Sequence, residues 1–239
     1  MKLFIVKDKK TGDKKAFEII KKQILHKPDS LIGLAAGKTI NGLYKLVSYD
    51  AMKYPNTWKK IKIFQIDENF GINSDSELSF NHQIKKKLKS LIKKLSPLNI
   101  FLIEGTKNPK KTISEGYRFL KKNGGIDLII LGIGTEYDPH IAYNTSGRSL
   151  LNSKMRVVDL HPKEAAKVTT QKGITLGIKD ILNTKKVLLM AYGKEKAKSV
   201  KLAFKGRVDT KRASASALQL HKDLNIVTDK EAGKFLRYN

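Results

Sequence analysis

Short apolar runs alternate with amphipathic segments along nearly the whole chain. The runs are residues 3–6, 31–35, 61–66, 100–103, 126–131, 187–191 and 226–227. The helices expected between them are residues 14–26, a segment around 43–47, residues 84–95, a segment ending at 122 and residues 195–204, of which 84–95 shows the clearest helical spacing of apolar residues. Strands that alternate with helices form a parallel sheet covered by helices. We therefore expect an α/β fold, with one domain over residues 1–239 and a mostly parallel central sheet in a Rossmann-like, doubly wound arrangement.

The composition sets the outer limits on what the chain does. With 239 residues and 40% hydrophobic residues, the chain is long enough to bury one large core. The absence of cysteine excludes disulfides, a thiolate nucleophile and a Cys-ligated metal. The apolar run at the N-terminus is too short for a signal peptide, and no stretch approaches the ~20 apolar residues of a membrane span. We expect a cytoplasmic protein that makes no membrane contact.

The charge of the chain is strongly positive. Lys and Arg number 48 against 22 Asp and Glu, which gives a formal net charge of +26. Such a charge favours anionic partners, from phosphorylated metabolites to nucleic acid. The lysines are spread over nearly every expected helix, and the sequence has no basic tail, zinc-finger spacing or aromatic-basic RNA motif. We interpret the charge as a general lysine bias, and we do not expect a nucleic-acid partner, which would cause steeply salt-dependent retention on DNA.

Polar residues follow three of the expected strands. They are Gly37, Lys38 and Thr39; Asp67 and Glu68; and Asp138 and His140. Ligands of α/β proteins bind at the carboxyl ends of parallel strands, so we expect these three groups to meet at one edge of the sheet. A histidine titrates near neutral pH and can move protons for a sugar-sized substrate there. A loop histidine bonded to a nearby carboxylate is the simpler alternative.

The loop of residues 33–39 has the composition of an anion site. Gly37-Lys38-Thr39 is similar to the end of a P-loop, but Ile32 stands where that motif needs its first glycine, so the full motif is absent. A small-residue loop between a strand and a helix still offers backbone N–H groups and a helix dipole to an anion. We interpret it as a monophosphate cradle rather than a nucleotide site; an ordinary strand-to-helix turn is the alternative.

Several motifs together resemble those of glucosamine-6-phosphate deaminases/isomerases, whose superfamily includes the 6-phosphogluconolactonases. They are Gly33–Thr39 with Tyr44, Asp67-Glu68 with Gly71, Asp138–Asn144, Gly173–Leu182, Gly193–Ala197 and Ser216–His221. They run in the family's order across nearly the whole chain. Gly173–Leu182 is most similar to the galactosamine-6-phosphate isomerase branch.

The resemblance implies an activity and a set of roles. The glucosamine-6-phosphate deaminases/isomerases convert an amino-sugar 6-phosphate to a ketohexose 6-phosphate and ammonia without a metal or an organic cofactor. Asp67 matches the carboxylate that shuttles a proton, a role that suits a carboxyl whose pKa is raised toward neutrality by burial. His140 matches the acid/base of ring opening and Asp138 its orienting partner, while Lys196 and the loop of residues 37–39 match the phosphate site. The sequence does not decide the oligomeric state, and a homo-oligomer is possible.

The loop around His140 departs from the family pattern. Pro139 precedes His140 where the deaminases usually have a glycine, and Thr145 follows Asn144 where they have a glutamate. A threonine hydroxyl can form hydrogen bonds but cannot carry charge near neutral pH. We expect ring opening to suffer unless Glu136 folds back to substitute for that glutamate.

The segment between residues 159 and 172 is the second departure. It is shorter than the deaminase pattern and lacks the arginine that usually binds the phosphate there. Lys163, Lys167 and Lys172 could replace that arginine electrostatically, without its bidentate geometry.

Two alternatives to a deaminase/isomerase follow from these departures. A 6-phosphogluconolactonase needs a histidine to activate water and a phosphate cradle, so Thr145 is no obstacle to it; Asn69, where lactonases generally have an arginine, argues against it, and Asn144 and residues 175–178 favour the deaminase branch. The second alternative is a sugar-phosphate sensor without catalysis, since related folds serve as effector-binding domains of regulators. Against this alternative, the residues before Gly33 are too few for the helix-turn-helix of such a regulator. We expect a deaminase/isomerase ahead of both.

Overall fold

The structure, a computed structural model, describes residues 1–236. The strands are β1 (Lys2–Val6), β2 (Leu31–Leu34), β3 (Lys62–Gln65), β4 (Asp67–Asn69), β5 (Ile100–Phe101), β6 (Leu128–Gly132), β7 (Arg156–Asp159), β8 (Lys172–Thr175), β9 (Val187–Ala191) and β10 (Leu224–Asp229). The α-helices are α1 (Lys9–His26), α2 (Asn41–Lys53), α3 (Pro55–Trp58), α4 (Phe80–Lys87), α5 (Lys89–Ile92), α6 (Pro109–Lys122), α7 (Pro162–Ala165), α8 (Ile178–Leu182) and α9 (Ala197–Phe204). Three 3-10 segments are η1 (Pro97–Asn99), η2 (Lys194–Lys196) and η3 (Ser214–Leu220).

Two sheets organise the chain. A seven-stranded sheet has the order β1-β10-β9-β6-β2-β3-β5, and all its pairs are parallel. A small antiparallel sheet has the order β4-β8-β7. The predicted α/β fold with a mostly parallel central sheet flanked by helices is therefore confirmed.

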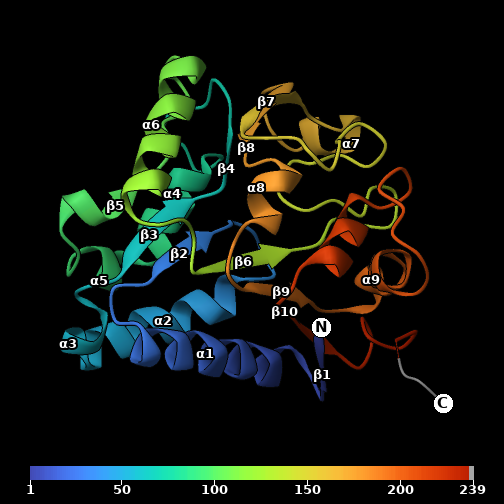
Figure 1. The fold of residues 1–239 in the computed structure, drawn as a ribbon, viewed down its shortest axis with the longest axis horizontal. Helices are drawn as coiled ribbons and strands as arrows, with labels where there is room; N and C mark the ends of the chain where they lie inside the picture. The colour runs from blue at the N-terminus through green and yellow to red at the C-terminus, as the bar shows by residue number, and fades with distance from the viewer. Residues whose placement is uncertain (237–239) are drawn as a thin grey trace.

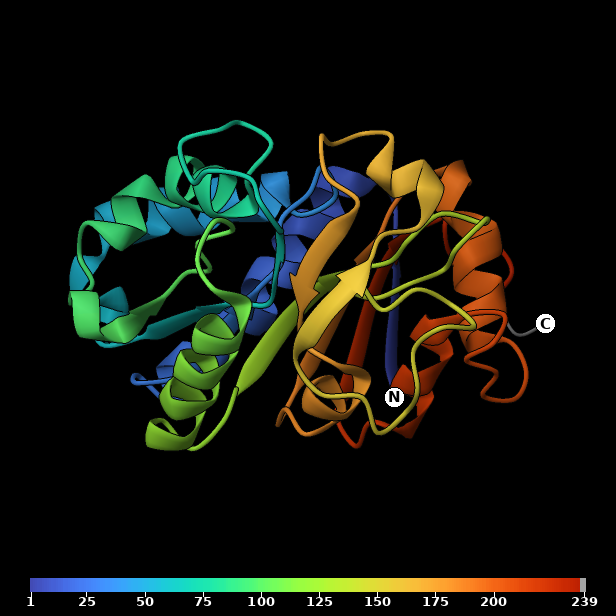
Figure 2. The same cartoon turned by 90° about the horizontal axis from the view of Figure 1, so that it is seen from above.

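Helices and the small sheet cover the two faces of the large sheet. Helices α1 and α2 lie together along one face, and α8 lies on the other (Figure 1). In the view from above, β7 and β8 cross over the strands of the large sheet (Figure 2). A parallel sheet needs such cover because both of its faces are apolar.

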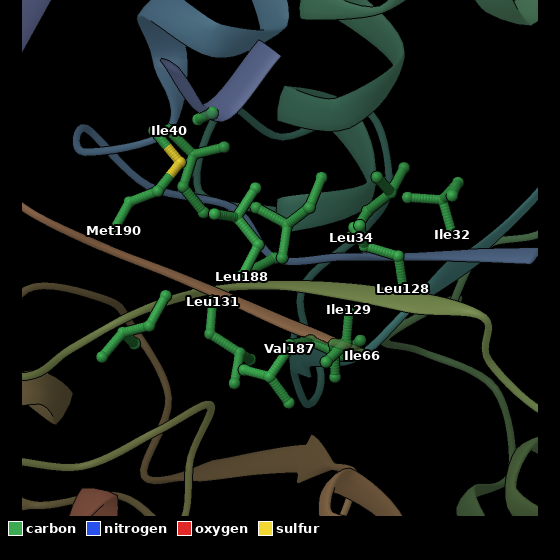
Figure 3. Close-up of a cluster of buried hydrophobic side chains, with 14 of the residues drawn as sticks. Ile32, Leu34, Ile40, Ile66, Leu128, Ile129, Leu131, Val187, Leu188 and Met190 are labelled. Carbon is green, nitrogen blue, oxygen red and sulfur yellow. The ribbon is translucent and has the colours of Figure 1, made fainter. Parts of the chain in front are cut away.

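The core lies on both sides of the central strands β2, β6 and β9. Figure 3 shows Leu128 and Leu188 on one side of these strands and Ile129 and Val187 on the other, as expected because successive strand residues face opposite ways. All four side chains are fully buried. The strands are therefore fixed firmly, and the loops at their carboxyl ends start from rigid positions.

The structure corrects the predicted helices at two places. The first helix begins at Lys9 rather than residue 14, because the Asp8 carboxylate accepts a hydrogen bond from the Thr11 backbone N–H at 2.8 Å and caps it. The helix expected over residues 84–95 is instead α4 and α5, separated at Leu88, whose backbone leaves helical geometry at φ −104° and ψ 23°.

The small sheet was not among the predicted elements. Its strand β4 carries Asp67, Glu68 and Asn69, residue types that are rare in strands, and β8 contains a glycine. The register pairs Asp67 with Thr175 and Glu68 with Ile174. The small sheet therefore lines up the polar residues after β3 with a segment more than a hundred residues away in the sequence.

Among residues 1–236, none of the helices combines the length and the apolar character that crossing a membrane requires.

Candidate active site

A cavity of about 410 Å³ opens at the carboxyl ends of adjacent strands of the large sheet. The loops that follow β2, β6 and β9 all contribute to it, as does β4, which follows β3. Its lining is Ala35, Ala36, Gly37, Lys38, Thr39, Ile40, Asp67, Phe80, Gly132, Ile133, Gly134, Thr135, His140, Ala142, Tyr143, Glu164, Lys167, Glu195 and Lys196. Each of the three groups predicted at the strand ends contributes to this lining, but Glu68 and Asp138 are not part of it.

The loop after β2 forms one end of the cavity. Gly37 has a φ of +132°, which glycine adopts without strain. The Tyr44 hydroxyl donates to the Ala35 carbonyl at 2.6 Å, and the Lys9 ammonium donates to the Thr39 carbonyl at 3.1 Å, so both ends of the loop are held from behind. The loop leads directly into α2, whose N-terminal N–H groups and dipole favour an anion.

Lys196 lines the same cavity. Its ammonium donates to the Ile133 carbonyl at 2.7 Å, and burial lowers its pKa from the ordinary lysine value. Gly193, at φ +87°, makes the turn from β9 that brings this lysine into the cavity. A partly desolvated ammonium that shares a cavity with a helix N-terminus is suited to bind a phosphate group.

Asp67 has the most perturbed carboxyl of the cavity. It is 6% exposed, and its Oδ1 atom makes no hydrogen bond within the part of the chain that the structure describes. Burial, followed by the negative charge of Glu68, raises its pKa to about 8. Phe80 and Tyr143, whose rings stack with centroids 5.7 Å apart, also line the cavity. Asp67 therefore fits a group that exchanges protons near neutral pH.

Glu68 lies outside the cavity, in the protein interior. It is fully buried, and its carboxylate accepts hydrogen bonds from five donors. These are the side chains of Gln65 and Ser79 and the backbone N–H groups of Asn69, Phe80 and Asn81. Its place beside Asp67 is structural: it fixes β4 to the start of α4 and supplies a negative charge behind Asp67.

His140 and Asp138 form the predicted pair. The His140 Nδ1 atom lies 3.0 Å from Asp138 Oδ2, and Asp138 Oδ1 accepts from the Ser146 backbone N–H at 2.8 Å. Burial alone would raise the pKa of Asp138, but the hydrogen bond and charge of His140 and the bonds from Ser146 outweigh it and lower this pKa. An ionised carboxylate on Nδ1 leaves Nε2 as the atom of the ring that works on a substrate.

Asn144 and Thr145 shape the loop rather than the cavity. Asn144 is fully buried; its amide donates to the Leu176 carbonyl at 2.8 Å and its oxygen accepts from Arg156 at 3.2 Å. Thr145 is 8% exposed, and neither residue is part of the lining. Between them and His140, Ala142 holds a φ of +48°, a rare value for a residue with a side chain, at the edge of the cavity.

The hypothesis that Glu136 folds back toward His140 is wrong in this structure. Its carboxylate pairs with the Lys198 ammonium at 2.8 Å, its side chain is 53% exposed, and it is outside the cavity lining. The adjacent Tyr137 turns the other way, toward α7. The ion pair with Lys198, an exposed lysine on α9, therefore keeps the Glu136 carboxylate away from the site.

Helix α7 and the turn after it supply two charged residues that complete the cavity. Glu164 and Lys167 line it and bind each other, with Lys167 Nζ 2.8 Å from Glu164 Oε1. Lys167 is one of the three lysines expected to compensate for a missing arginine, and it is the one placed in the cavity. Lys172 instead pairs with Asp159 at 3.1 Å, and Lys163 lies over the ring of Tyr137 at 4.6 Å. Glu164 was not predicted, because a Glu beside lysines on a short segment is typical of an exposed surface charge.

Residues 1–236 contain no group of three or more His, Asp or Glu side chains arranged to hold a metal ion.

The order of the motifs and the geometry of the cavity agree with one family. A family model described as "Glucosamine-6-phosphate isomerases/6-phosphogluconolactonase" matches residues 10–226. The chain belongs to this family. The match extends from the start of α1 into β10 and so includes every loop that builds the cavity.

Curated relatives of similar length lie in the same family. A glucosamine-6-phosphate deaminase of Clostridium botulinum (strain Langeland) is 32% identical over 247 aligned positions, covering 99% of both chains. A glucosamine-6-phosphate deaminase of Thermoanaerobacter sp. (strain X514) is 33% identical and covers 99% of this chain and 95% of its own. One from Clostridium novyi (strain NT) is 34% identical and covers 99% and 100%.

Solved structures extend the likeness to the fold. A monomeric glucosamine-6-phosphate deaminase superposes with a TM-score of 0.90 at 26% identity, covering 98% of this chain and all of that one. The 6-phosphogluconolactonase of Trypanosoma brucei superposes with a TM-score of 0.77 at 18% identity, covering 99% and 98%. The second comparison concerns the fold alone. Deaminases and lactonases of this family share one fold, so the fold alone does not separate the two activities. The residues of the cavity have to be used instead.

Proposed function

We propose that this protein is an amino-sugar-phosphate deaminase/isomerase, which converts glucosamine 6-phosphate or galactosamine 6-phosphate to a ketohexose 6-phosphate and ammonia. The full-length likeness to glucosamine-6-phosphate deaminases supports this proposal. The observation that carries it is the Asp67 carboxyl, which has an unbonded oxygen and a pKa of about 8 in the same cavity as the His140–Asp138 pair. Isomerisation needs a group that takes a proton from one carbon and returns it to the next, whereas lactone hydrolysis does not.

The phosphate end of the cavity positions the sugar. We assign the substrate phosphate to the loop of Gly37, Lys38 and Thr39, to the N-terminus of α2, and to Lys196 on the facing loop. Lys167 adds a third ammonium from the turn after α7. A phosphate fixed at this end leaves the C1 and C2 end of a six-carbon sugar in reach of the acid/base groups.

Two proton-transfer centres then divide the reaction. His140, oriented by Asp138, moves a proton from the C1 hydroxyl to the ring oxygen, so that the ring opens and C1 becomes an aldehyde. Asp67 in its ionised form takes the proton from C2 and returns it to C1, which leaves a C=N bond at C2. Water then adds to C2 and the C–N bond breaks, so that ammonia leaves and the water oxygen becomes the ketose carbonyl. A pKa of about 8 makes Asp67 a stronger base than an exposed aspartate, which is needed to remove a proton from carbon.

The test offers three substrates in parallel to the pure protein. Glucosamine 6-phosphate and galactosamine 6-phosphate are followed by ammonia release, and freshly made 6-phosphogluconolactone by loss of the lactone above its spontaneous rate. Ammonia release from either amino sugar supports the proposal, and the ratio of the two kcat/KM values assigns the configuration at C4. Lactone loss without ammonia moves the chain to the lactonase branch, with His140 as the base that activates water.

A sensor without catalysis is the remaining alternative. It predicts that the protein binds sugar 6-phosphates, measured by isothermal titration calorimetry, and turns over none of the three compounds. Binding without turnover would therefore overturn the enzymatic proposal while preserving the phosphate site.

A further inference from the structure

Glu164 has one anchored and one open carboxylate oxygen. Its Oε1 atom accepts from the Tyr137 hydroxyl and from Lys167 Nζ, the latter at 2.8 Å. Its Oε2 atom makes no hydrogen bond within residues 1–236. The side chain is 20% exposed and lines the same cavity as His140. The residue is thus held in place through one oxygen and leaves the other for the cavity.

The anchor of Glu164 is part of the loop that carries His140. Tyr137 lies three residues before His140, and its hydroxyl also accepts from Lys167 Nζ at 3.2 Å. Its ring packs on His161 with centroids 5.1 Å apart. These contacts join α7 to the His140 loop, so the position of the Glu164 carboxylate is tied to that of the imidazole.

The carboxylate of Glu164 is ionised at neutral pH. Burial alone would raise its pKa, but the hydrogen bonds from Lys167 and Tyr137 and the charge of Lys167 outweigh burial and lower it. The positive charge of protonated His140 is a further, smaller cause of the lowering, and both side chains line the same cavity.

The charges around His140 make this carboxylate chemically relevant. The cavity contains three ammonium groups, those of Lys38, Lys167 and Lys196, and each disfavours a further positive charge nearby. Asp67 has a pKa of about 8 and is mostly neutral at pH 7, so it offsets little of that charge. Glu195 lies on the turn after Gly193, and its charge acts on the neighbouring Lys196. Glu164 is therefore the lining carboxylate that is bonded to the His140 loop, through Tyr137, and its negative charge acts on Lys196 as well.

We propose that Glu164 is a positioning residue for ring opening, whose carboxylate stabilises the imidazolium form of His140 between its two proton transfers. This inference rests on the proposed function. In the first transfer the C1 hydroxyl gives its proton to His140 Nε2, C1 becomes a carbonyl, and the bond from C1 to the ring oxygen breaks with its electron pair on that oxygen. In the second, the same proton passes from His140 to the ring oxygen. Asp138 binds the imidazolium through Nδ1, and Glu164 stabilises it from α7 by its negative charge, without a direct hydrogen bond.

The test compares Glu164→Gln with Glu136→Gln, a matched control that removes the neighbouring carboxylate outside the cavity. We expect Glu164→Gln to lower kcat for the amino-sugar phosphate at least about tenfold. The KM and the inhibition constant of glucitol 6-phosphate, an acyclic compound with no ring to open, should stay within about twofold, because Lys196 and the loop of residues 37–39 still bind the phosphate when Lys167 loses its ion pair with Glu164. Glu136→Gln should match the wild type in all three quantities.

Two further variants separate charge from folding. Glu164→Asp keeps the charge and should recover part of the lost kcat, and Tyr137→Phe keeps the carboxylate but removes one of its anchors, so it should lose less than Glu164→Gln. Equal kcat values for Glu164→Gln and wild type would overturn the inference. So would a parallel rise in KM and in the inhibition constant, since that would make Glu164 a support of the phosphate site only. A wild type that releases no ammonia from either amino sugar would instead remove the proposed function and, with it, this role.

Discussion

Asp67 and Glu68 are consecutive residues of β4 whose carboxyl groups have opposite environments. Glu68 is surrounded by five hydrogen-bond donors, whereas Asp67 Oδ1 makes no hydrogen bond in the described part of the chain. Successive strand residues face opposite sides, so one carboxylate points into the interior and the other into the cavity. The interior charge is satisfied by its donors and also raises the pKa of its neighbour.

The substitution Asp67→Asn should abolish turnover and preserve binding. An amide cannot accept the proton from C2, so we expect kcat for ammonia release to fall by about 10²–10⁴-fold. The Kd of glucitol 6-phosphate, measured by calorimetry, should stay close to that of the wild type, because the phosphate cradle is untouched. Ammonia release at the wild-type rate from this variant would remove Asp67 from the mechanism.

The same variant should be more stable than the wild type at alkaline pH. The pKa of Asp67 is about 8 in the folded protein, against the ordinary value of 3.8 expected in the unfolded chain. Between about pH 4 and 8 the unfolded chain has therefore lost a proton that the folded protein still binds, and the stability of the fold falls as the pH rises through this range. The amide of the variant has no such proton to lose. The Tm advantage of Asp67→Asn should therefore be small at pH 4 and reach about 5 °C or more at pH 9. A Tm difference that does not grow between these pH values contradicts the raised pKa.

The substitution Glu68→Gln should destabilise the fold. Glutamine has an NH₂ group, a donor, in place of one of the two carboxylate oxygens of Glu68. The buried backbone N–H groups of Phe80 and Asn81, at the start of α4, donate to these two oxygens, so one of them loses its acceptor. We expect the free energy of unfolding, measured with urea, to fall by about 2–4 kcal/mol. Glu77→Gln is the matched control, because that carboxylate is exposed and pairs only with Lys86 on the surface. Equal losses in the two variants would show that the five bonds to Glu68 contribute little.

The sequence predicts the large sheet well because its strands are apolar and regularly separated by helices. The apolar runs of β6 and β9 are short, continuous and bounded by polar or glycine residues, which is typical of buried strands. The order of the strands is not readable from the same pattern: β2 pairs with β6 although almost a hundred residues separate them. That pairing decides which loops share the cavity.

The site was predictable where a residue follows an apolar strand, and not where another element brings it in. Asp67, His140 and Lys196 all lie on segments that follow strands, and the structure places each in the cavity. Glu164 and Lys167 come from α7 and the turn after it, which the small sheet carries over the cavity, and no local pattern distinguishes them from surface charges. Glu136 is closer to His140 in sequence, yet Lys198 holds it outside. Tertiary contacts decide between the two glutamates.

The substitution Lys196→Ala should weaken binding of the phosphate group. Removal of a charged hydrogen-bond donor costs about 1–3 kcal/mol, which raises the KM for amino-sugar phosphates by about five- to 150-fold. Lys194→Ala is the matched control, because Lys194 is exposed on the same turn and lies outside the cavity lining. A KM that is unchanged in Lys196→Ala, or raised equally in both variants, contradicts the assignment of Lys196 to the phosphate.

The substitution Asp138→Asn should lower kcat and stability together, with a pH dependence of its own. An asparagine neither fixes the tautomer of His140 nor stabilises its imidazolium, so we expect kcat to fall by about 10²–10⁴-fold. The pKa of Asp138 is lower in the folded protein than its ordinary value of 3.8, so its stabilising effect is present above about pH 4 and is lost as the pH falls below that. The Tm deficit of the variant should thus be largest near pH 7 and shrink toward pH 3. Asp75→Asn, on an exposed loop, is the control and should show neither effect. If the Tm deficit of Asp138→Asn does not depend on pH, packing of the loop accounts for the loss, rather than the charge pair with His140.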